Sequence, residues 1–171
     1  MTIVFLCLSR VWDIHDKEIY PDLLREFINE DNDVYIFTPI ERRYGQTTQI
    51  IRQGRATIIK VKTLNIQKTN LIEKGIGTIL IERQYLHAVK RYLKVENVDL
   101  VLYATPPITL LAPILYLKKK YAAKTYLMLK DIFPQNAVDL GMISKNGIKG
   151  LLYRIFRKKE QQLYAISERI G

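Results

Sequence analysis

The polar residues that could do chemistry follow short apolar runs that have the character of buried strands. Asp131 and Asn136 come after the run 125–129, and Thr105 ends the run 100–104. Open α/β sheets bind ligands at the carboxyl ends of their parallel strands, so these side chains are expected to line a cleft there. Asp131 is the candidate catalytic carboxylate. The alternative is that Asp131 caps the short helix that follows it.

Cationic side chains occupy the same position after the first two apolar runs. Arg10 follows the run 2–8, and Arg42 and Arg43 follow the run 34–38. A guanidinium group can bind a phosphate through two parallel hydrogen bonds, so these arginines are candidate phosphate-binding residues. Solvated arginines paired with neighbouring carboxylates are the alternative.

The loop after the first apolar run adds two titratable groups, His15 and Asp16, to the candidate ligand-binding residues. A single loop histidine is more often a surface residue, and this is the alternative to a ligand-binding role for His15. His87 has no Cys, His or carboxylate at metal-ligand spacing, and no metal site is predicted. Cys7, the single cysteine, lies in an apolar run and is expected to be a core thiol, which excludes a disulfide framework and fits a reducing compartment.

The hydrophobic pattern predicts the elements that must position these residues. Apolar runs of strand length alternate with segments of helical periodicity, which is typical of an α/β fold. We expect an open, doubly wound, mostly parallel Rossmann-like sheet in the order 3-2-1-4-5 with helices on both faces. The strands are expected at 2–8, 34–38, 56–63, 100–104 and 125–129, and the helices at 16–29, 79–93, 106–116 and 147–170. Residues 44–55 are expected to form a loop, and a sixth strand is expected to be missing.

Composition and charge limit the function classes. The chain has 171 residues, 48% of them hydrophobic, and a formal net charge of +10, which suits one domain with an anionic partner. No window of about eighteen apolar residues is free of charges, so no spanning helix is expected. The segment 145–159 has six basic residues and no acidic one. This segment is interpreted as a basic amphipathic helix at an anionic membrane surface. A solvated helix face and nucleic-acid binding are the alternatives, and no nucleic-acid recognition motif supports nucleic-acid binding.

Two motifs carry a family resemblance. The sequence TPP at 105–107 is followed by D-x-F-P-x-x-A-x-x-L-G at 131–141. With the order of elements, this pattern resembles the amino-terminal half of GT-B glycosyltransferases, in particular the retaining family 4 enzymes of bacterial capsule and O-antigen synthesis. The Gly-Gly of that family's first loop is replaced by Ser9-Arg10-Val11-Trp12, and the Glu-x7-Glu donor motif is absent.

The resemblance implies a division of labour between two domains. Residues 1–171 would be the acceptor-binding domain, which binds a sugar on a polyprenyl-diphosphate lipid at the cytoplasmic membrane face. The donor-binding domain, which binds the nucleotide-sugar, would be absent, so the chain alone is expected to be inactive. No cofactor is implied. The implied acceptor-binding residues are Arg10, His15, Asp16, Arg42, Arg43, Thr105 and Asn136, and the implied membrane-surface residues are Lys149, Arg154, Arg157 and Lys158.

Two other functions fit the same pattern. The chain could be a non-catalytic, membrane-recruiting subunit of a split glycosyltransferase, active only with a separate donor-domain chain. It could also be a self-sufficient flavodoxin-like module that binds a nucleotide or a flavin. Binding of a free nucleotide or flavin at micromolar concentration would favour the flavodoxin-like reading, because the glycosyltransferase reading leaves the nucleotide on the missing domain.

Overall fold

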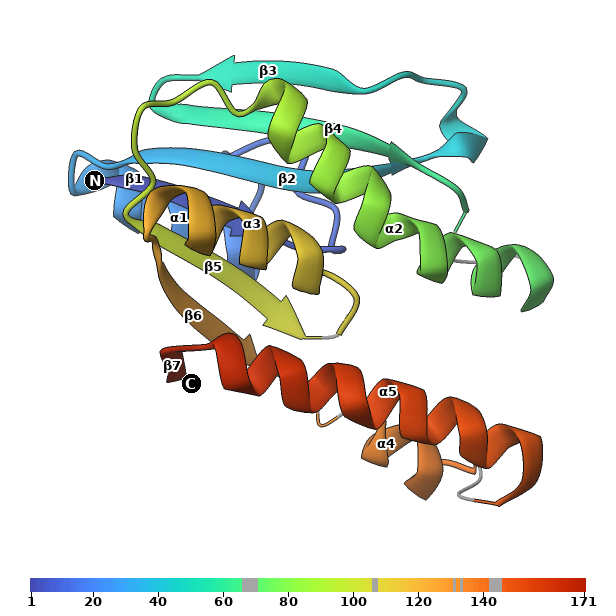
Figure 1. Cartoon of the computed structure of the whole chain (residues 1–171). Coiled ribbons are helices and arrows are strands. Elements are labelled where there is room, and N and C mark those ends of the chain that lie inside the picture. The colour runs from blue at the N-terminus through green and yellow to red at the C-terminus, as the bar shows by residue number, and fades with distance from the viewer. Residues whose placement is uncertain (66–70, 106–107, 131, 133, 142–145) are drawn as a thin grey trace.

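The computed structural model of the chain describes residues 1–65, 71–105, 108–130, 132, 134–141 and 146–171, without the side chains of 71–79, 148, 149 and 152. These residues form a seven-stranded sheet (Figure 1). Its strands are β1 (Thr2–Leu6), β2 (Asp33–Glu41), β3 (Gln49–Gln53), β4 (Ala56–Thr63), β5 (Leu100–Thr105), β6 (Lys124–Leu129) and β7 (Arg169–Ile170). The helices are α1 (Ile19–Asn29), α2 (Leu71–Tyr92), α3 (Leu111–Tyr121), α4 (Gln135–Asp139) and α5 (Gly147–Ile166), and Arg42–Tyr44 form a 3-10 turn.

The sheet confirms the expected fold class. Its order is β3-β4-β2-β1-β5-β6-β7, and the pairs from β4 to β7 are parallel. The five strands predicted from the sequence are β1, β2, β4, β5 and β6, and they stand in the predicted order. Two further strands extend the sheet, β3 antiparallel to β4 at one edge and β7 parallel to β6 at the other.

Helices cover both faces of the sheet because alternate residues of each strand point to opposite sides. Val4 and Leu6 of β1 belong to a core cluster completed by apolar residues of α2, α3 and α5. Ile3 and Phe5 belong to a second cluster, completed by α1 and by the loop after β1. Figure 1 shows α2, α3 and α5 as one layer in front of the sheet, with α1 behind it.

The second strand is longer than predicted, since Pro39 does not end it. β2 runs to Glu41, and Pro39 pairs in register with Val61 of β4. On the other side, β1 pairs with β2 only as far as Phe37. Pro39 therefore lies beyond the last β1 pair, where its missing N–H interrupts no ladder hydrogen bond. The chain then returns through β3, so the prediction of a loop over 44–55 was wrong for 49–53.

Several helix boundaries also differ from the prediction. α2 begins at Leu71 rather than near residue 79, in a stretch whose Gly75 and Gly77 weaken the helical pattern. α3 begins at Leu111, after the two prolines that were expected to open it. α5 ends at Ile166, and β7 follows it, so the expected absence of a sixth parallel strand was wrong.

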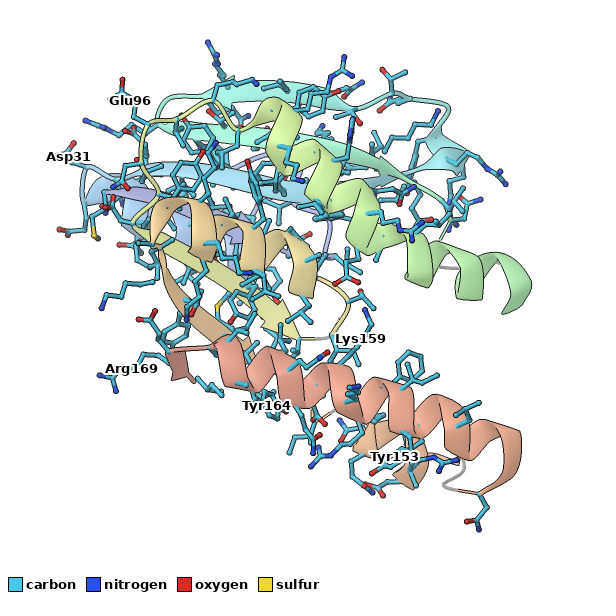
Figure 2. All side chains as sticks on the ribbon, viewed as in Figure 1. Asp31, Glu96, Tyr153, Lys159, Tyr164 and Arg169 are labelled. Carbon is cyan, nitrogen blue, oxygen red and sulfur yellow. The ribbon has the colours of Figure 1, made fainter. Side chains whose placement is uncertain are left out.

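One carboxylate joins three helices at the carboxyl edge of the sheet. Glu82 of α2 accepts a hydrogen bond from the backbone N–H of Ala112, in the first turn of α3, at 2.8 Å. Its other oxygen pairs with the Lys159 ammonium of α5 at 2.7 Å. Figure 2 shows Lys159 on the side of α5 that faces the rest of the molecule. The first turn of a helix has unpaired N–H groups, so Glu82 both caps α3 and holds α5.

The buried hydroxyl of Tyr85 gives a stability prediction. Tyr85 is fully buried and donates a hydrogen bond of 2.7 Å to the Cys7 backbone carbonyl. We expect Tyr85→Phe to lower the free energy of unfolding by about 1–2 kcal/mol, because the Cys7 carbonyl loses its buried donor. Urea unfolding monitored by circular dichroism measures the change. Tyr35→Phe is the matched control, and an equal loss in both variants would contradict the role given to the Tyr85 hydroxyl.

Candidate functional site

A pocket of about 120 Å³ opens where β1 and β2 end. Its walls come from the loop after β1 and from the last residues of β2 with the turn that follows. Both segments lie at the carboxyl edge of the parallel sheet, the edge at which open α/β sheets bind ligands. The lining residues are Leu8, Arg10, Trp12, Pro39, Glu41 and Tyr44.

The loop after β1 is fixed in place although it lacks the glycine pair. The Val11 N–H donates to the Thr38 hydroxyl at 2.9 Å, and that hydroxyl donates to the Ser9 carbonyl at 2.9 Å. The Ile14 N–H donates to the Gln53 side-chain oxygen at 2.9 Å. Val11 and Ile14 are themselves buried in the core cluster on the α1 side. These anchors leave Arg10 and Trp12, between them in the chain, to line the pocket.

Trp12 stands among cations and a second aromatic ring. Its indole N–H donates to the Pro39 carbonyl at 3.2 Å, and its ring meets Tyr44 edge-on with 5.2 Å between centroids. The Arg10 guanidinium carbon and the Lys60 ammonium nitrogen lie 4.9 and 4.8 Å from the indole centroid. Cations in this position are attracted by the negative face of the ring. Trp12 therefore gathers positive charge beside the pocket.

The charge of Lys60 is opposed by its surroundings. Partial burial lowers the pKa of Lys60 below its ordinary value, and the carboxylates of Asp13 and Asp16 act in the opposite direction. The pKa of Asp13 is itself lowered, mainly because its carboxylate accepts a hydrogen bond from the His15 backbone N–H. The loop after β1 thus places the Asp13 carboxylate near the cations beside the pocket.

Glu41 gives the pocket a buried carboxylate. Glu41 is 7% exposed and forms an ion pair with Arg43. The backbone N–H of Arg43 donates to the Asn65 side-chain oxygen at 2.9 Å, which fixes the turn after β2. The guanidinium of Arg43 is therefore directed to Glu41, while Arg42 is exposed on the same turn.

The residues predicted for one cleft fall into separate groups. Arg10 lines the pocket, and Arg42 and Arg43 occupy the turn between two of its lining residues. His15 and Asp16 are exposed farther along the first loop, and neither lines the pocket. Thr105 is buried at the end of β5 and Asn136 is half-buried in α4, outside this pocket as well. Asp131 lies outside the described residues.

The predicted membrane-surface residues of α5 also differ in their surroundings. Arg154 and Lys158 are exposed. Arg157 forms an ion pair with Glu160, whose side chain is 1% exposed, so Arg157 compensates a buried charge of its own helix. The side chain of Lys149 lies outside the described part of the chain.

Four charged or aromatic residues of the site were not selected from the sequence: Trp12, Glu41, Tyr44 and Lys60. Trp12 is the single tryptophan of the chain and follows the first strand, a position that could have marked it. Lys60 lies inside β4 and carried no such signal. Arginine and lysine favour an anionic group, and the aromatic rings offer apolar faces for a sugar ring. Among the described residues, no cluster of three or more His, Cys, Asp or Glu could hold a metal ion.

Comparison with curated proteins finds similarity to a probable glycosyltransferase. The chain is 29% identical over 103 residues to the probable glycosyltransferase WbjE of Pseudomonas aeruginosa, which is 60% of this chain and 24% of that protein. No family model matches the chain. The chain therefore spans about a quarter of the curated relative that it matches.

Solved structures share the fold over the whole chain. A trehalose-6-phosphate structure from E. coli bound with UDP-2-fluoro glucose matches with a TM-score of 0.63 at 10% identity, over 99% of this chain and 39% of that one. Sucrose-phosphate synthase of Thermosynechococcus elongatus matches with a TM-score of 0.59 at 7% identity, over 99% of this chain and 42% of that one. The expected Rossmann-like fold of GT-B glycosyltransferase domains is thereby confirmed.

Proposed function

We propose that the chain is the acceptor-binding domain of a retaining, family 4-like glycosyltransferase. The observation that carries this proposal is the cationic and aromatic pocket at the carboxyl edge of the sheet, in a chain similar in sequence to a probable glycosyltransferase. The acceptor is a sugar linked to a lipid through a diphosphate, in the synthesis of a surface polysaccharide. The enzyme transfers a sugar from a nucleotide-sugar to this acceptor.

The cationic and the aromatic side chains of the pocket are proposed to bind different parts of the acceptor. Arg10, with Arg42 beside the pocket, binds the diphosphate through charge-assisted hydrogen bonds. Tyr44 is 45% exposed and offers its ring to the apolar face of the sugar. Glu41 accepts hydrogen bonds from sugar hydroxyls. This combination fits a sugar diphosphate better than a free sugar or a free phosphate.

The nucleotide-sugar is bound by a further domain, outside residues 1–171. The E. coli structure is bound with UDP-2-fluoro glucose, and this chain covers only 39% of it. Thr105 ends β5, and Asp131 and Asn136 come after β6 in the sequence; these residues form the proposed side of the cleft where acceptor meets donor. We keep Asp131 as the candidate catalytic carboxylate there.

The proposed acceptor requires work at the cytoplasmic face of a membrane. No helix in the described residues has the length and apolar composition to cross a bilayer. α5 exposes Leu151 (53%) and Ile155 (47%), which lie one helical turn apart. Arg154 directly precedes Ile155, and Lys158 follows it by three residues. Apolar and basic residues in this arrangement suit peripheral contact with an anionic bilayer, with Lys149, Arg154, Arg157 and Lys158 as the proposed contacts.

The single tryptophan provides a direct test. Because Trp12 lines the pocket, its fluorescence should change saturably when the purified chain is titrated with a short-prenyl diphosphate-linked N-acetylglucosamine. The probe carries the diphosphate and the sugar that the pocket is proposed to recognise. UDP-glucose should leave the emission unchanged over the same concentrations, because the nucleotide site lies outside this chain.

Two results would contradict the proposal. A micromolar response to UDP-glucose or to flavin would make the chain a nucleotide-binding module. No response to the prenyl diphosphate-linked sugar, or to the same probe with other sugars, would remove the acceptor pocket.

A further inference from the structure

We propose that the outer face of α2 and α3 is a second membrane-contact surface, whose partner is an anionic phospholipid bilayer. The surface is defined by Arg83, Lys90, Arg91, Lys94, Lys119 and Lys120, and we call it the basic helical surface. It rests on the proposed function, which already requires a membrane-bound acceptor. It adds which side of the molecule faces the lipid.

The charge of this surface has one sign. All six side chains are exposed. In the described side chains of 80–94 and 111–121, the only carboxylate belongs to Glu82, which already accepts the Ala112 N–H and pairs with Lys159. The next carboxylate in the chain is that of Glu96, which projects at the border of the surface beyond the end of α2 (Figure 2). Among the described side chains of the two helices, no carboxylate is left to neutralise the basic helical surface.

Tyr116 connects two of these cations across the two helices. Tyr116 of α3 lies under two ammonium groups, that of Lys90 at 5.1 Å and that of Lys120 at 5.8 Å from its ring centroid. Lys120 also stands 4.7 Å from the ring centroid of Tyr121. Since Lys90 comes from α2 and Tyr116 from α3, these contacts bridge the seam between the two helices.

The same tyrosines suit a bilayer interface. Their rings are partly buried against the core cluster below. The side chain of Tyr121, followed by that of Tyr116, raises the pKa of Lys120. A tyrosine with an apolar ring and a polar end is enriched where a protein meets lipid headgroups. Lysine and arginine near an anionic membrane each add to binding.

The α1 side of the sheet carries a small excess of carboxylates. Glu18, Glu26 and Glu30 are exposed at or near α1, whereas Asp22 is paired with Arg25 and Lys17 is an exposed cation beside them. The α1 layer and the α2, α3 and α5 layer lie on different faces of the sheet. Charge separated in this way turns one face of the protein toward a negative surface.

A bilayer fits these observations better than a soluble acidic polymer. The basic helical surface spans two helices that lie side by side in one layer (Figure 1). α5 belongs to the same layer and exposes Leu151 and Ile155, which a bilayer can cover and a hydrophilic polymer cannot. Lipid therefore accounts for both the charge and the exposed apolar residues of this layer.

The test is vesicle sedimentation of a variant and a charge-matched control. The variant replaces Lys90, Arg91, Lys119 and Lys120 by glutamine. The control replaces four exposed cations elsewhere, Lys17, Arg52, Lys62 and Arg169, and so changes the net charge equally. Figure 2 shows Arg169 pointing away from α2 and α3. Partitioning onto vesicles of equal parts phosphatidylglycerol and phosphatidylcholine should fall about 100-fold or more in the variant, and only a few-fold in the control.

The outcomes separate this inference from the proposed function. Equal losses in variant and control, or wild-type binding that pure phosphatidylcholine matches, would overturn the basic helical surface as a lipid contact. The Trp12 titration should be unchanged in the variant. A failed titration with normal vesicle partitioning would overturn the acceptor pocket alone.

Discussion

Replacing Arg10 by alanine should weaken binding of the prenyl diphosphate-linked sugar about 10- to 100-fold. The Arg10 guanidinium lines the pocket and is the lining residue with a permanent positive charge. Hydrogen bonds between a guanidinium and a phosphate contribute about 1.5–3 kcal/mol, which corresponds to this range of dissociation constants. Trp12 remains in the variant, so the same fluorescence titration measures the loss.

Two variants give this prediction its controls. Arg52→Ala removes an exposed arginine of β3 that does not line the pocket, and it should leave the dissociation constant unchanged. Arg10→Lys keeps the charge but not the forked geometry, so it should restore only part of the affinity. An Arg10→Ala variant that binds as tightly as the wild type would show that Arg10 is held for its contact with Trp12 alone.

The thiol of Cys7 should react with iodoacetamide at least about 1000-fold more slowly in the folded chain than in the unfolded chain at pH 8. Cys7 is 1% exposed in the core. Burial raises the pKa of the Cys7 thiol from 9.0 to about 12. The thiolate is the reactive form, and its fraction at pH 8 falls about 1000-fold with that change. The chain has one cysteine, so mass spectrometry of the intact protein follows the reaction without ambiguity.

The same pKa gives the sign of a pH effect. The folded state keeps the Cys7 thiol protonated, and the unfolded state ionises it above pH 9. The contribution of this group to stability is therefore complete below pH 9 and decreases as the pH rises toward 12. Cys7→Ser removes the thiol from both measurements. Folded-state labelling within tenfold of the rate in guanidinium chloride would contradict the burial of Cys7.

The strands that could be predicted from the sequence are those whose own apolar residues indicate burial in the sheet. β1, β2, β4, β5 and β6 are apolar because both of their faces are covered by helices, and parallel connection then fixes their order. β3 could not be predicted in this way. Its residues alternate between exposed and half-buried at an edge, and it exists because it pairs antiparallel to β4. β7 has only two residues, and its pairing with β6 defines it.

The candidate site was predictable in place but not in composition. Position after a strand identified Arg10, because the carboxyl edge of a parallel sheet is a general ligand site. The contacts of Trp12 depend on residues that are distant in sequence, such as Pro39 and Lys60, which the fold brings next to it. The ion pair of Arg43 with Glu41 is the alternative that the sequence left open for these arginines, a pairing with a neighbouring carboxylate. No local sequence pattern shows which distant residues a side chain such as Trp12 will contact.

The carboxylate of Glu82 makes two helices mechanically dependent on each other. One of its oxygens fixes the first turn of α3, directly after the segment that leaves β5, and the other holds Lys159 of α5. A displacement of α5 that breaks the contact with Lys159 leaves the carboxylate with one partner fewer, so its position at the start of α3 changes as well. Movement of the last helix is therefore coupled to the start of α3 through Glu82, in addition to the hydrogen bond that Lys118 of α3 donates to the Ile166 carbonyl of α5.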